Sequence, residues 1–263
     1  MSTAAEGFAF DCAGASDTGR VRHHNEDSVL VGQRLWAVAD GMGGHAAGDI
    51  ASALVIEGLR PLDEEDDLRP ADLVDALHAV NDRILAHGHD NPAVRGLGST
   101  VTGLALVAVA GAAHWAVFNV GDSRVYREAD GALARATVDH SEAEELLLEG
   151  VITAEQARTH RARNIVTRSL GQPDTPQVDL WLLPQTPGER FLICSDGLNG
   201  ELTDDAIHAI LAAHPDPGQA AARLVAAALE GGGRDNVTAI VLNVEGAASD
   251  PGNTNPRPTE VPA

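Results

Sequence analysis

The chain has 263 residues, of which 18 are basic and 39 acidic, giving a formal charge of −21 at neutral pH. All the basic residues are arginine, which excludes Schiff-base catalysis, a lysine general base and the Walker A phosphate loop. So acidic a surface repels nucleic-acid backbones and anionic lipid, and neither nucleic acid nor a membrane is therefore expected as a partner. The hydrophobic share of 44% is typical of a folded protein with one large or two small domains.

Cysteine usage and the first residues both favour a cytoplasmic protein. Cys12 and Cys194 fit neither a disulfide framework nor a zinc site, which favours a reducing compartment. The first eleven residues lack the basic and apolar regions of a secretory signal, so no targeting segment is expected.

One uncharged stretch, residues 101–121, is long enough to span a bilayer. It contains Thr102, His114 and Asn119, however, and small residues interrupt it around Gly111. The β-branched and aromatic residues on both sides of this break favour two strands joined by a turn over a membrane helix.

Apolar patterns predict a protein of many strands with four longer helices. The strands are expected at 8–14, 28–32, 35–40, 101–110, 114–120, 123–128, 132–138, 178–183, 190–195 and 236–244. The helices are expected at 46–59, 71–86, 204–213 and 218–230, where apolar residues recur at helical spacing. Thr203 is a candidate N-cap for the third of these helices.

Residues 141–170 have a different character and are expected to form a small helical flap. Two capping-box patterns open short helices there, Ser141 with Glu144 and Thr153 with Gln156. We expect one domain over residues 1–245. Residues 246–263 are rich in Pro, Gly, Asn, Thr and Ser without periodicity, and predict a disordered tail.

Single acidic residues stand at the ends of several predicted strands. Because the end of one antiparallel strand lies beside the start of its neighbour, these residues can gather on one rim; they are Asp27, Asp40, Asp122, Asp196 and Asp235. The alternative is that an Asp-Gly pair only marks a turn, as Asp130-Gly131 is expected to do. Both interpretations stay open at this point.

Clustered carboxylates repel one another unless cations neutralise them. Oxygen ligands select hard cations such as Mg²⁺ or Mn²⁺ over zinc or copper. Two divalent ions would outweigh three aspartates and leave the site locally positive, which suits an anionic substrate such as a phosphate ester.

Eight blocks of the chain, in this order, resemble the type 2C (PPM-type), metal-dependent protein serine/threonine phosphatases in their bacterial form. The blocks are GRVRHHNEDSVLV, VADGMGGHAAGDIAS, GSTVTGLAL, FNVGDSRVYR, DHS, TRSLG, CSDGLNGELTD and GGRDNVTAIVL. Together they cover most of the chain, from about residue 14 to residue 244.

The resemblance implies an α+β fold, a four-layer α/β/β/α sandwich of two antiparallel sheets flanked by helices, with the flap at about 141–170 beside a cleft. Residues 1–245 would then be a phosphatase catalytic domain. Its implied activity is hydrolysis of phosphoserine and phosphothreonine in proteins, reversing a bacterial Ser/Thr kinase, by a hydroxide that bridges two Mn²⁺ or Mg²⁺ ions. We expect a monomer.

The resemblance also implies roles for individual residues. Asp40 would bridge the two metals, the Gly41 carbonyl would bind one of them, and Asp196 and Asp235 would complete the ligands of the other. Further residues would act around them: Asp122 at a third, weaker metal site, Glu26 and Asp27 through metal-bound water, and Arg22 as the arginine that binds the substrate phosphate.

Two further residues are candidates for roles at the site. Animal members place a histidine after the Asp-Gly pair as the general acid, but this chain has Met42 there, which leaves His45 or a metal-bound water as candidate proton donors. Asn236 is a candidate to orient the neighbouring Asp235.

Two rival functions are considered. A phosphoprotein-binding pseudophosphatase would retain the fold without turnover, but the three main metal-ligand aspartates are all present here. A metal-dependent nuclease would share the carboxylates, but the charge of −21 argues against it.

Overall fold

Two antiparallel sheets lie face to face in the computed structural model, which describes residues 3–5, 8–43 and 47–246. The first sheet has the strand order β1-β2-β12-β11-β8-β9. Its strands are β1 (Thr3–Ala5), β2 (Phe8–Asp17), β8 (Arg124–Ala129), β9 (Ala132–Arg135), β11 (Arg190–Cys194) and β12 (Val237–Gly246).

The second sheet has the order β10-β7-β6-β4-β3, and the short strand β5 pairs with β4. Its strands are β3 (Asp27–Val31), β4 (Leu35–Met42), β5 (Gly98–Ser99), β6 (Val101–Val109), β7 (Ala112–Val120) and β10 (Asp179–Pro184). Strands β6 and β7 are the predicted hairpin, and their turn at Ala110 and Gly111 has positive φ at both residues, as a tight two-residue hairpin turn requires. No helix in the part of the chain that the structure describes is both long and apolar enough to cross a membrane.

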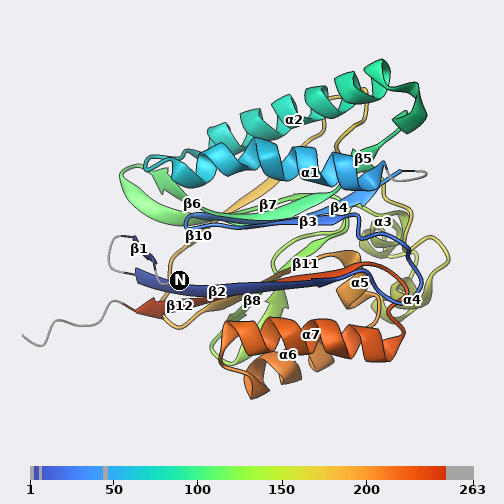
Figure 1. Cartoon of the computed structure of the whole chain (residues 1–263). Helices are drawn as coiled ribbons and strands as arrows, with labels where there is room; N and C mark the ends of the chain where they lie inside the picture. Colours follow the sequence, from blue (N-terminus) through green and yellow to red (C-terminus); the bar gives the residue numbers. More distant parts are fainter. Residues whose placement is uncertain (1–2, 6–7, 44–46, 247–263) are drawn as a thin grey trace, which may run out of the picture.

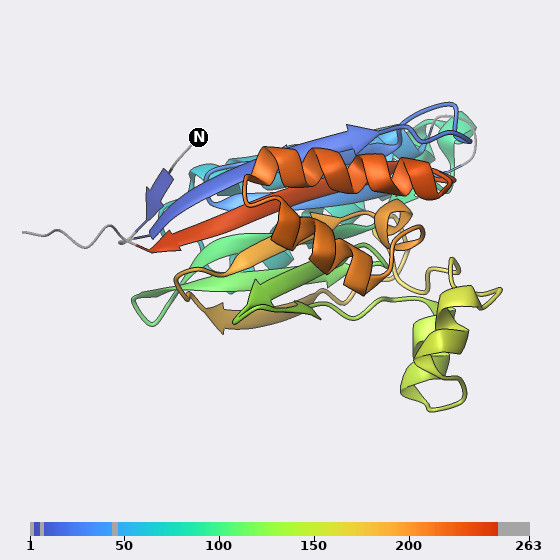
Figure 2. The ribbon, with the colours of Figure 1, turned by 90° about the horizontal axis from the view of Figure 1, so that it is seen from below.

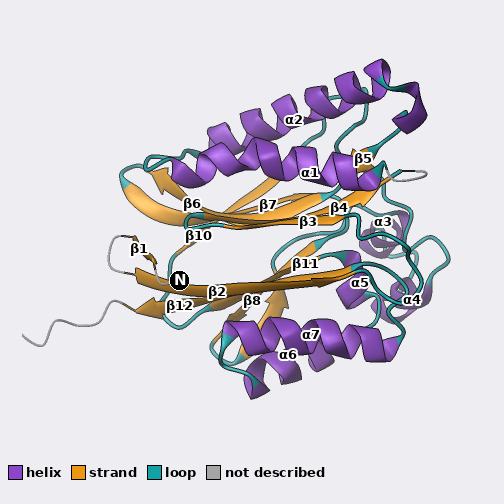
Figure 3. Ribbon diagram, viewed as in Figure 1, coloured by secondary structure: helices purple, strands orange, loops and turns teal. Residues whose placement is uncertain are grey.

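Helices cover the outer face of each sheet, so that the molecule has four layers (Figures 1 and 3). Helices α1 (Gly48–Leu59) and α2 (Pro70–Asp90) pack on the β3–β4–β6–β7 side. Helices α6 (Asp204–Ala213) and α7 (Pro217–Gly231) pack on the other sheet. Short helices complete the fold, namely η1 (Arg60–Glu64), η2 (Pro92–Val94), α3 (Glu142–Leu148), α4 (Ala154–Thr159) and α5 (Asp196–Asn199).

The core between the sheets is built around four aromatic side chains that meet edge to face. Trp115 is in contact with Phe10, Trp36 and Phe191, with ring centroids 5.3 to 6.0 Å apart. Such contacts fix the sheets against each other because large buried rings add directional contacts to their hydrophobic burial. The two sheets therefore hold their strand ends in a defined relative position.

The predicted α/β/β/α architecture and its four longer helices are confirmed. Observed helix bounds differ from the predicted ones by a few residues, and Thr203 caps α6 by accepting a hydrogen bond from the amide of Ala206. The predicted turn at Asp130-Gly131 is also present, with positive φ at both residues between β8 and β9. Helix α5, which begins at Asp196, is an addition that the sequence patterns did not indicate.

The flap contains the two short helices α3 and α4, which stand out from one end of the sandwich (Figure 2). The capping box of α4 is complete, whereas that of α3 is only half formed. Ser141 caps α3, but the Glu144 side chain turns to Arg135 instead of returning to the cap. The ion pair with an arginine of β9 therefore ties the flap to the first sheet.

Two of the sequence predictions concern residues outside the described part of the chain. These are the disordered tail, apart from residue 246 at the end of β12, and His45 as a proton donor.

Candidate active site

The five predicted aspartates come together at the end of the sandwich from which the flap projects. They reach it from different elements: Asp27 starts β3, Asp40 lies near the end of β4, Asp122 lies between β7 and β8, Asp196 starts α5 after β11, and Asp235 precedes β12. Both sheets therefore contribute to one acidic cluster. Asp27 and Asp40 are directly opposite each other in the β3–β4 register.

Asp27 is held in place by the opposite sheet. Its Oδ2 accepts hydrogen bonds from Ser195 Oγ at 2.8 Å and from Thr238 Oγ1 at 2.6 Å. Its Oδ1 is buried and has no hydrogen-bond partner among the described residues. A buried carboxylate oxygen without a donor is energetically costly, so this atom marks a place where a positive group or water fits.

The backbone of Asp40 is fixed by the residues around β5. Ser99 Oγ donates to the Asp40 carbonyl at 3.0 Å, and the Thr100 amide donates to the same oxygen at 2.9 Å. Thr100 Oγ1 in turn accepts from the Asp40 amide at 3.2 Å and lies 2.9 Å from Ser123 Oγ. Through this chain of hydrogen bonds the position of Asp40 is tied to the turn that carries Asp122.

Burial and the neighbouring negative charges raise the pKa values of three aspartates in the cluster. Burial, and then the charges of Asp196 and Asp235, raise the pKa of Asp27 to about 7. Burial and the neighbouring Asp235 raise the pKa of Asp196 to about 6, although a hydrogen bond shared with Asp40 acts in the opposite direction. Burial and the surrounding aspartates raise the pKa of Asp40 well above its usual value. The cluster thus carries more negative charge than its surroundings can stabilise.

Asp122 extends the cluster toward the flap. Its side chain is buried, and burial together with the charges of Asp196 and Asp139 raises its pKa well above the usual value. Asp139 itself is neutralised by Arg124, which donates to both carboxylate oxygens at 2.6 to 3.0 Å. Asp122 therefore lines the pocket as a carboxylate that forms no ion pair with an arginine within the described ranges.

Close backbone packing surrounds the Gly41 carbonyl. A Cβ at Gly41 would lie 2.0 Å from the Gly48 carbonyl oxygen and 2.7 Å from that of Glu26, so only glycine fits there. The Glu26 carboxyl group packs against Gly48 at the start of α1. Glu26 and Gly41 are thus both brought to the rim where Asp27 and Asp40 lie.

Arg22 lies at the edge of the acidic cluster, on the loop between β2 and β3. Its Nη2 is 2.7 Å from Asp235 Oδ2, and its side chain is about half exposed, at 49%. The charges of Glu26 and Asp40 also raise the pKa of this guanidinium, after the larger effect of the Asp235 hydrogen bond. Arg22 therefore remains cationic and presents its exposed side to solvent at the site.

Asn236 holds the loop that carries Arg22. Its Nδ2 donates to the carbonyls of Thr18 and His24 at 2.8 and 2.9 Å, and its Oδ1 accepts from the Glu26 amide at 2.8 Å. Only its backbone amide contacts the neighbouring aspartate, by donating to Asp235 Oδ1 at 2.9 Å. The expected orientation of Asp235 thus comes from the backbone of Asn236, while the side chain clamps the loop.

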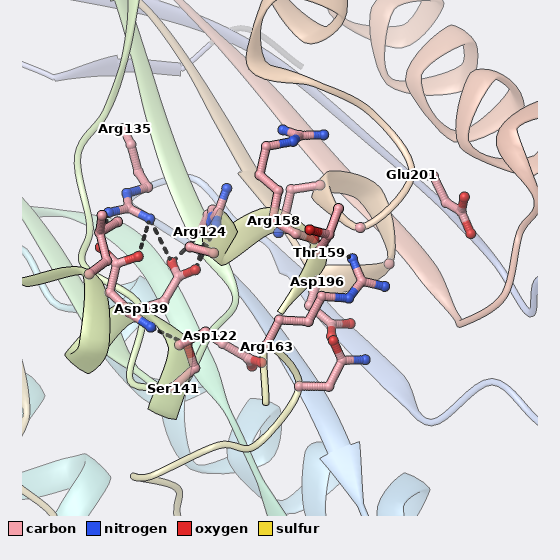
Figure 4. Close-up of a pocket in the computed structure, with 18 of the residues that line it drawn as sticks. Asp122, Arg124, Arg135, Asp139, Ser141, Arg158, Thr159, Arg163, Asp196 and Glu201 are labelled. Atoms are coloured by element: carbon pink, nitrogen blue, oxygen red, sulfur yellow. Dashed lines mark hydrogen bonds and ion pairs between the residues drawn. The ribbon is translucent and has the colours of Figure 1, made fainter. Parts of the chain in front are cut away.

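A cavity of about 770 Å³ opens between the acidic cluster and the flap (Figure 4). Asp122, Asp196 and Asp235 line one side of it, and residues of α3, α4 and the following loop line the other. Cavities of this size are large enough for a phosphate group together with neighbouring parts of a substrate.

The donor set fits hard divalent cations. All its ligating atoms are oxygens, burial and then the neighbouring aspartates raise the pKa of Asp40, and Asp27 Oδ1 has no donor among the described residues. Within the described residues no three Asp, Glu, His or Cys side chains already enclose a point where one ion would sit.

Some residues of the site were not indicated by the sequence analysis. Ser195 and Thr238, which hold Asp27, come from strands far from it in the chain. The flap arginines Arg158 and Arg163 line the cavity opposite the acidic cluster. A usable signal for these was present, because four of the 18 arginines fall within residues 158–168.

Comparison with known proteins gives one consistent family. The model of the protein phosphatase 2C family matches residues 20–228. The serine/threonine protein phosphatase PstP of Mycobacterium tuberculosis is 40% identical over 247 residues, which is 93% of this chain. The serine/threonine phosphatase stp of Listeria welshimeri is 33% identical over 238 residues, which is 86% of this chain and 93% of the relative. The chain spans only about half, 46%, of the length of the mycobacterial relative.

Solved structures agree with these relatives. The crystal structure of the mycobacterial phosphatase PstP superimposes with a TM-score of 0.83 at 39% identity, covering 90% of this chain and 99% of that one. A second structure, of the PstP catalytic domain in complex with two manganese ions, has a TM-score of 0.80 at 39% identity over the same shares of the two chains.

The raised carboxyl pKa values predict a pH-dependent stabilisation by Mn²⁺. Without metal, Asp27 and Asp196 of the folded chain have pKa values of about 7 and about 6. In the unfolded chain both have the ordinary pKa of about 3.9. Between these values the folded chain therefore holds protons that the unfolded chain has released. This contribution to the free energy of unfolding is therefore present at low pH and lost as the pH rises from about 4 to about 7. Stabilisation by Mn²⁺ should increase across the same window, measured by urea unfolding with and without the metal. A stabilisation that stays flat contradicts the electrostatic description of the cluster.

The clamp formed by Asn236 predicts local loosening in Asn236→Ala. Loss of its three side-chain hydrogen bonds should raise hydrogen–deuterium exchange in residues 18–26 by about tenfold, as expected for roughly 1.4 kcal/mol of local stability. The control is Asn243→Ala on β12, the strand that follows Asn236, which removes a bond to the carbonyl of Pro215 instead. Equal protection of residues 18–26 in both variants contradicts the clamp.

Proposed function

Because the chain belongs to the protein phosphatase 2C family, we propose that it hydrolyses phosphoserine and phosphothreonine in proteins with divalent cations as cofactors. The observation that carries this proposal is the cluster of five aspartates at one end of the sandwich, with Arg22 at its edge. The cavity beside the cluster is open enough for a phosphorylated side chain of a protein.

The carboxylates are assigned as ligands by their position in the cluster. Asp40, the Gly41 carbonyl, Asp196 and Asp235 would hold two Mn²⁺ or Mg²⁺ ions, with Asp40 as the ligand shared by both ions and Asp196 and Asp235 completing the ligands of one of them. Glu26 and Asp27 act through bound water. When bound, the ions supply a water activated for attack and neutralise charge on the phosphoryl group. The manganese ions of the mycobacterial PstP structure support this assignment.

Asp122 is the candidate for a third and weaker cation. It is buried next to Asp196 and has no arginine partner, while the neighbouring Asp139 is neutralised by Arg124. With a single carboxylate as its main protein ligand, such a site binds less tightly than one with several.

Arg22 binds the phosphate of the substrate. Its planar guanidinium can donate two parallel hydrogen bonds to phosphate oxygens, and its half-exposed position leaves it accessible to solvent and ligands. The ion pair with Asp235 holds it beside the carboxylates, and Asn236 fixes its loop. Arg22 therefore orients the phosphoryl group and stabilises the negative charge that develops during attack.

Departure of the serine or threonine alkoxide requires a proton. Met42 occupies the position after the Asp-Gly pair and cannot supply one. His45 is the nearest candidate in sequence and belongs to the residues that the structure does not describe.

The cellular role follows from the reaction. The protein reverses the action of a Ser/Thr kinase on phosphorylated protein substrates, as a monomer in the reducing cytoplasm, where its unpaired thiols Cys12 and Cys194 are stable. A phosphoprotein-binding pseudophosphatase is the alternative, but such a protein has no need for the full set of aspartates that this chain retains.

The assignment of Asp40 predicts loss of turnover in Asp40→Asn. The variant should keep its fold and hydrolyse a phosphothreonine peptide more than about a hundredfold more slowly with Mn²⁺ present, since it lacks the central ligand charge. The matched control is Asp130→Asn in the β8–β9 turn, where asparagine tolerates the positive φ of 52° and activity should be unchanged. Full turnover by Asp40→Asn would show that this carboxylate is not a metal ligand.

Metal dependence gives a second and independent test. Treatment with a chelator should abolish hydrolysis of the phosphopeptide, and added Mn²⁺ should restore it. If the chelated enzyme releases phosphate as fast as the untreated enzyme, this result contradicts the proposed chemistry.

A further inference from the structure

The cavity beside the acidic cluster contains two arginines with no carboxylate partner. Five arginines line it, and three of them are neutralised: Arg124 by Asp139, Arg135 by Glu144, and Arg234 by Glu201. Arg158 and Arg163 form no ion pair with any residue that the structure describes. Most arginines that line this cavity are therefore paired with a carboxylate, and the two that are not, Arg158 and Arg163, belong to the flap.

The two arginines are close to each other and to the catalytic cluster. Arg163 Nη1 lies 3.4 Å from the Arg158 carbonyl, at the end of α4. Arg158, Arg163 and Asp196 all line the same cavity. Figure 4 shows Arg158, Thr159 and Arg163 in the same part of the pocket as Asp196.

A simple role in solubility does not account for this placement. Arg161, between the two, is exposed as Arg158 is, but unlike Arg158 it does not line the cavity. Arg163, in contrast, is partly buried and directed to the interior of the pocket. In a chain of net charge −21, two unpaired guanidiniums in one cavity form a local anion-binding region.

We propose that Arg158 and Arg163 form a subsite for a second anionic group of the substrate, close in sequence to the phosphorylated residue. This inference rests on the proposed function, because the phosphate bound at Arg22 and the aspartates places the neighbouring residues of the substrate along the flap. An extended chain advances about 3.3 Å per residue, so the second group lies within a few residues of the first. Aspartate, glutamate and a second phosphorylated residue share the chemistry that this subsite binds.

The test compares three phosphothreonine peptides that differ at one flanking position, with alanine, glutamate or phosphoserine. The wild-type enzyme should have a higher kcat/KM for the two anionic peptides, by about three- to tenfold for a partly exposed contact with arginine. The glutamate and phosphoserine arms separate a preference for acidic sequence from one for doubly phosphorylated sites. In Arg158→Ala/Arg163→Ala the ratio of anionic to alanine peptide should fall to about one.

Arg161→Ala is the control, because it removes the same charge from the same flap outside the cavity. It should keep the wild-type ratio, which separates a local contact from a general effect of net charge. An unchanged ratio in the double variant, or equal kcat/KM of the wild type for all three peptides, overturns the subsite while leaving the proposed function intact. Failure of the wild type to hydrolyse any of the peptides with Mn²⁺ would overturn the proposed function itself.

Discussion

Repulsion among carboxylates at one end of the sandwich is the constraint around which the rest of the structure is organised. Five aspartates from both sheets meet there, and burial, together with the neighbouring carboxylates, raises the pKa values of Asp27, Asp40, Asp122 and Asp196. Such a cluster opposes folding unless it is compensated. The aromatic core between the sheets and the helices on their outer faces provide this compensation. They fix the strand ends from which the aspartates project.

Arginine balances this excess of negative charge in two different ways. Where it is paired it is structural: Arg124 with Asp139 connects β8 to the segment before the flap, and Arg135 with Glu144 connects β9 to the flap. Near the acidic cluster it is available to bind an anion, since Arg22 has an exposed side and the flap arginines Arg158 and Arg163 form no ion pair within the described residues. With lysine absent, every one of these contacts uses the planar guanidinium, which suits the recognition of carboxylate and phosphate groups.

Much of this could be predicted from the sequence because it depends on local pattern. The β6–β7 hairpin, the turn at Asp130-Gly131 and the capping box of α4 follow from neighbouring residues. The gathering of the aspartates followed from the adjacency of antiparallel strand ends, with Asp27 opposite Asp40 as the clearest case. The assignment of metals to these residues still rests on the family.

The remaining features depend on contacts between distant parts of the chain. The side chain of Asn236 clamps residues more than 200 positions away, so nothing near it in the sequence indicates the loop that it holds. Glu144 leaves its predicted capping role because Arg135 lies within reach in the folded chain. Likewise, Arg158 and Arg163 differ from the other arginines of the cavity because the fold places none of the described carboxylates within ion-pair distance of them.

The most direct test of the account is an anomalous diffraction map of crystals soaked in Mn²⁺. We predict two strong peaks among the carboxylates of Asp40, Asp196 and Asp235, with Asp40 in contact with both. A map with no peak among these side chains, or with manganese bound only elsewhere on the molecule, would contradict the central claim that this acidic cluster is a two-metal centre.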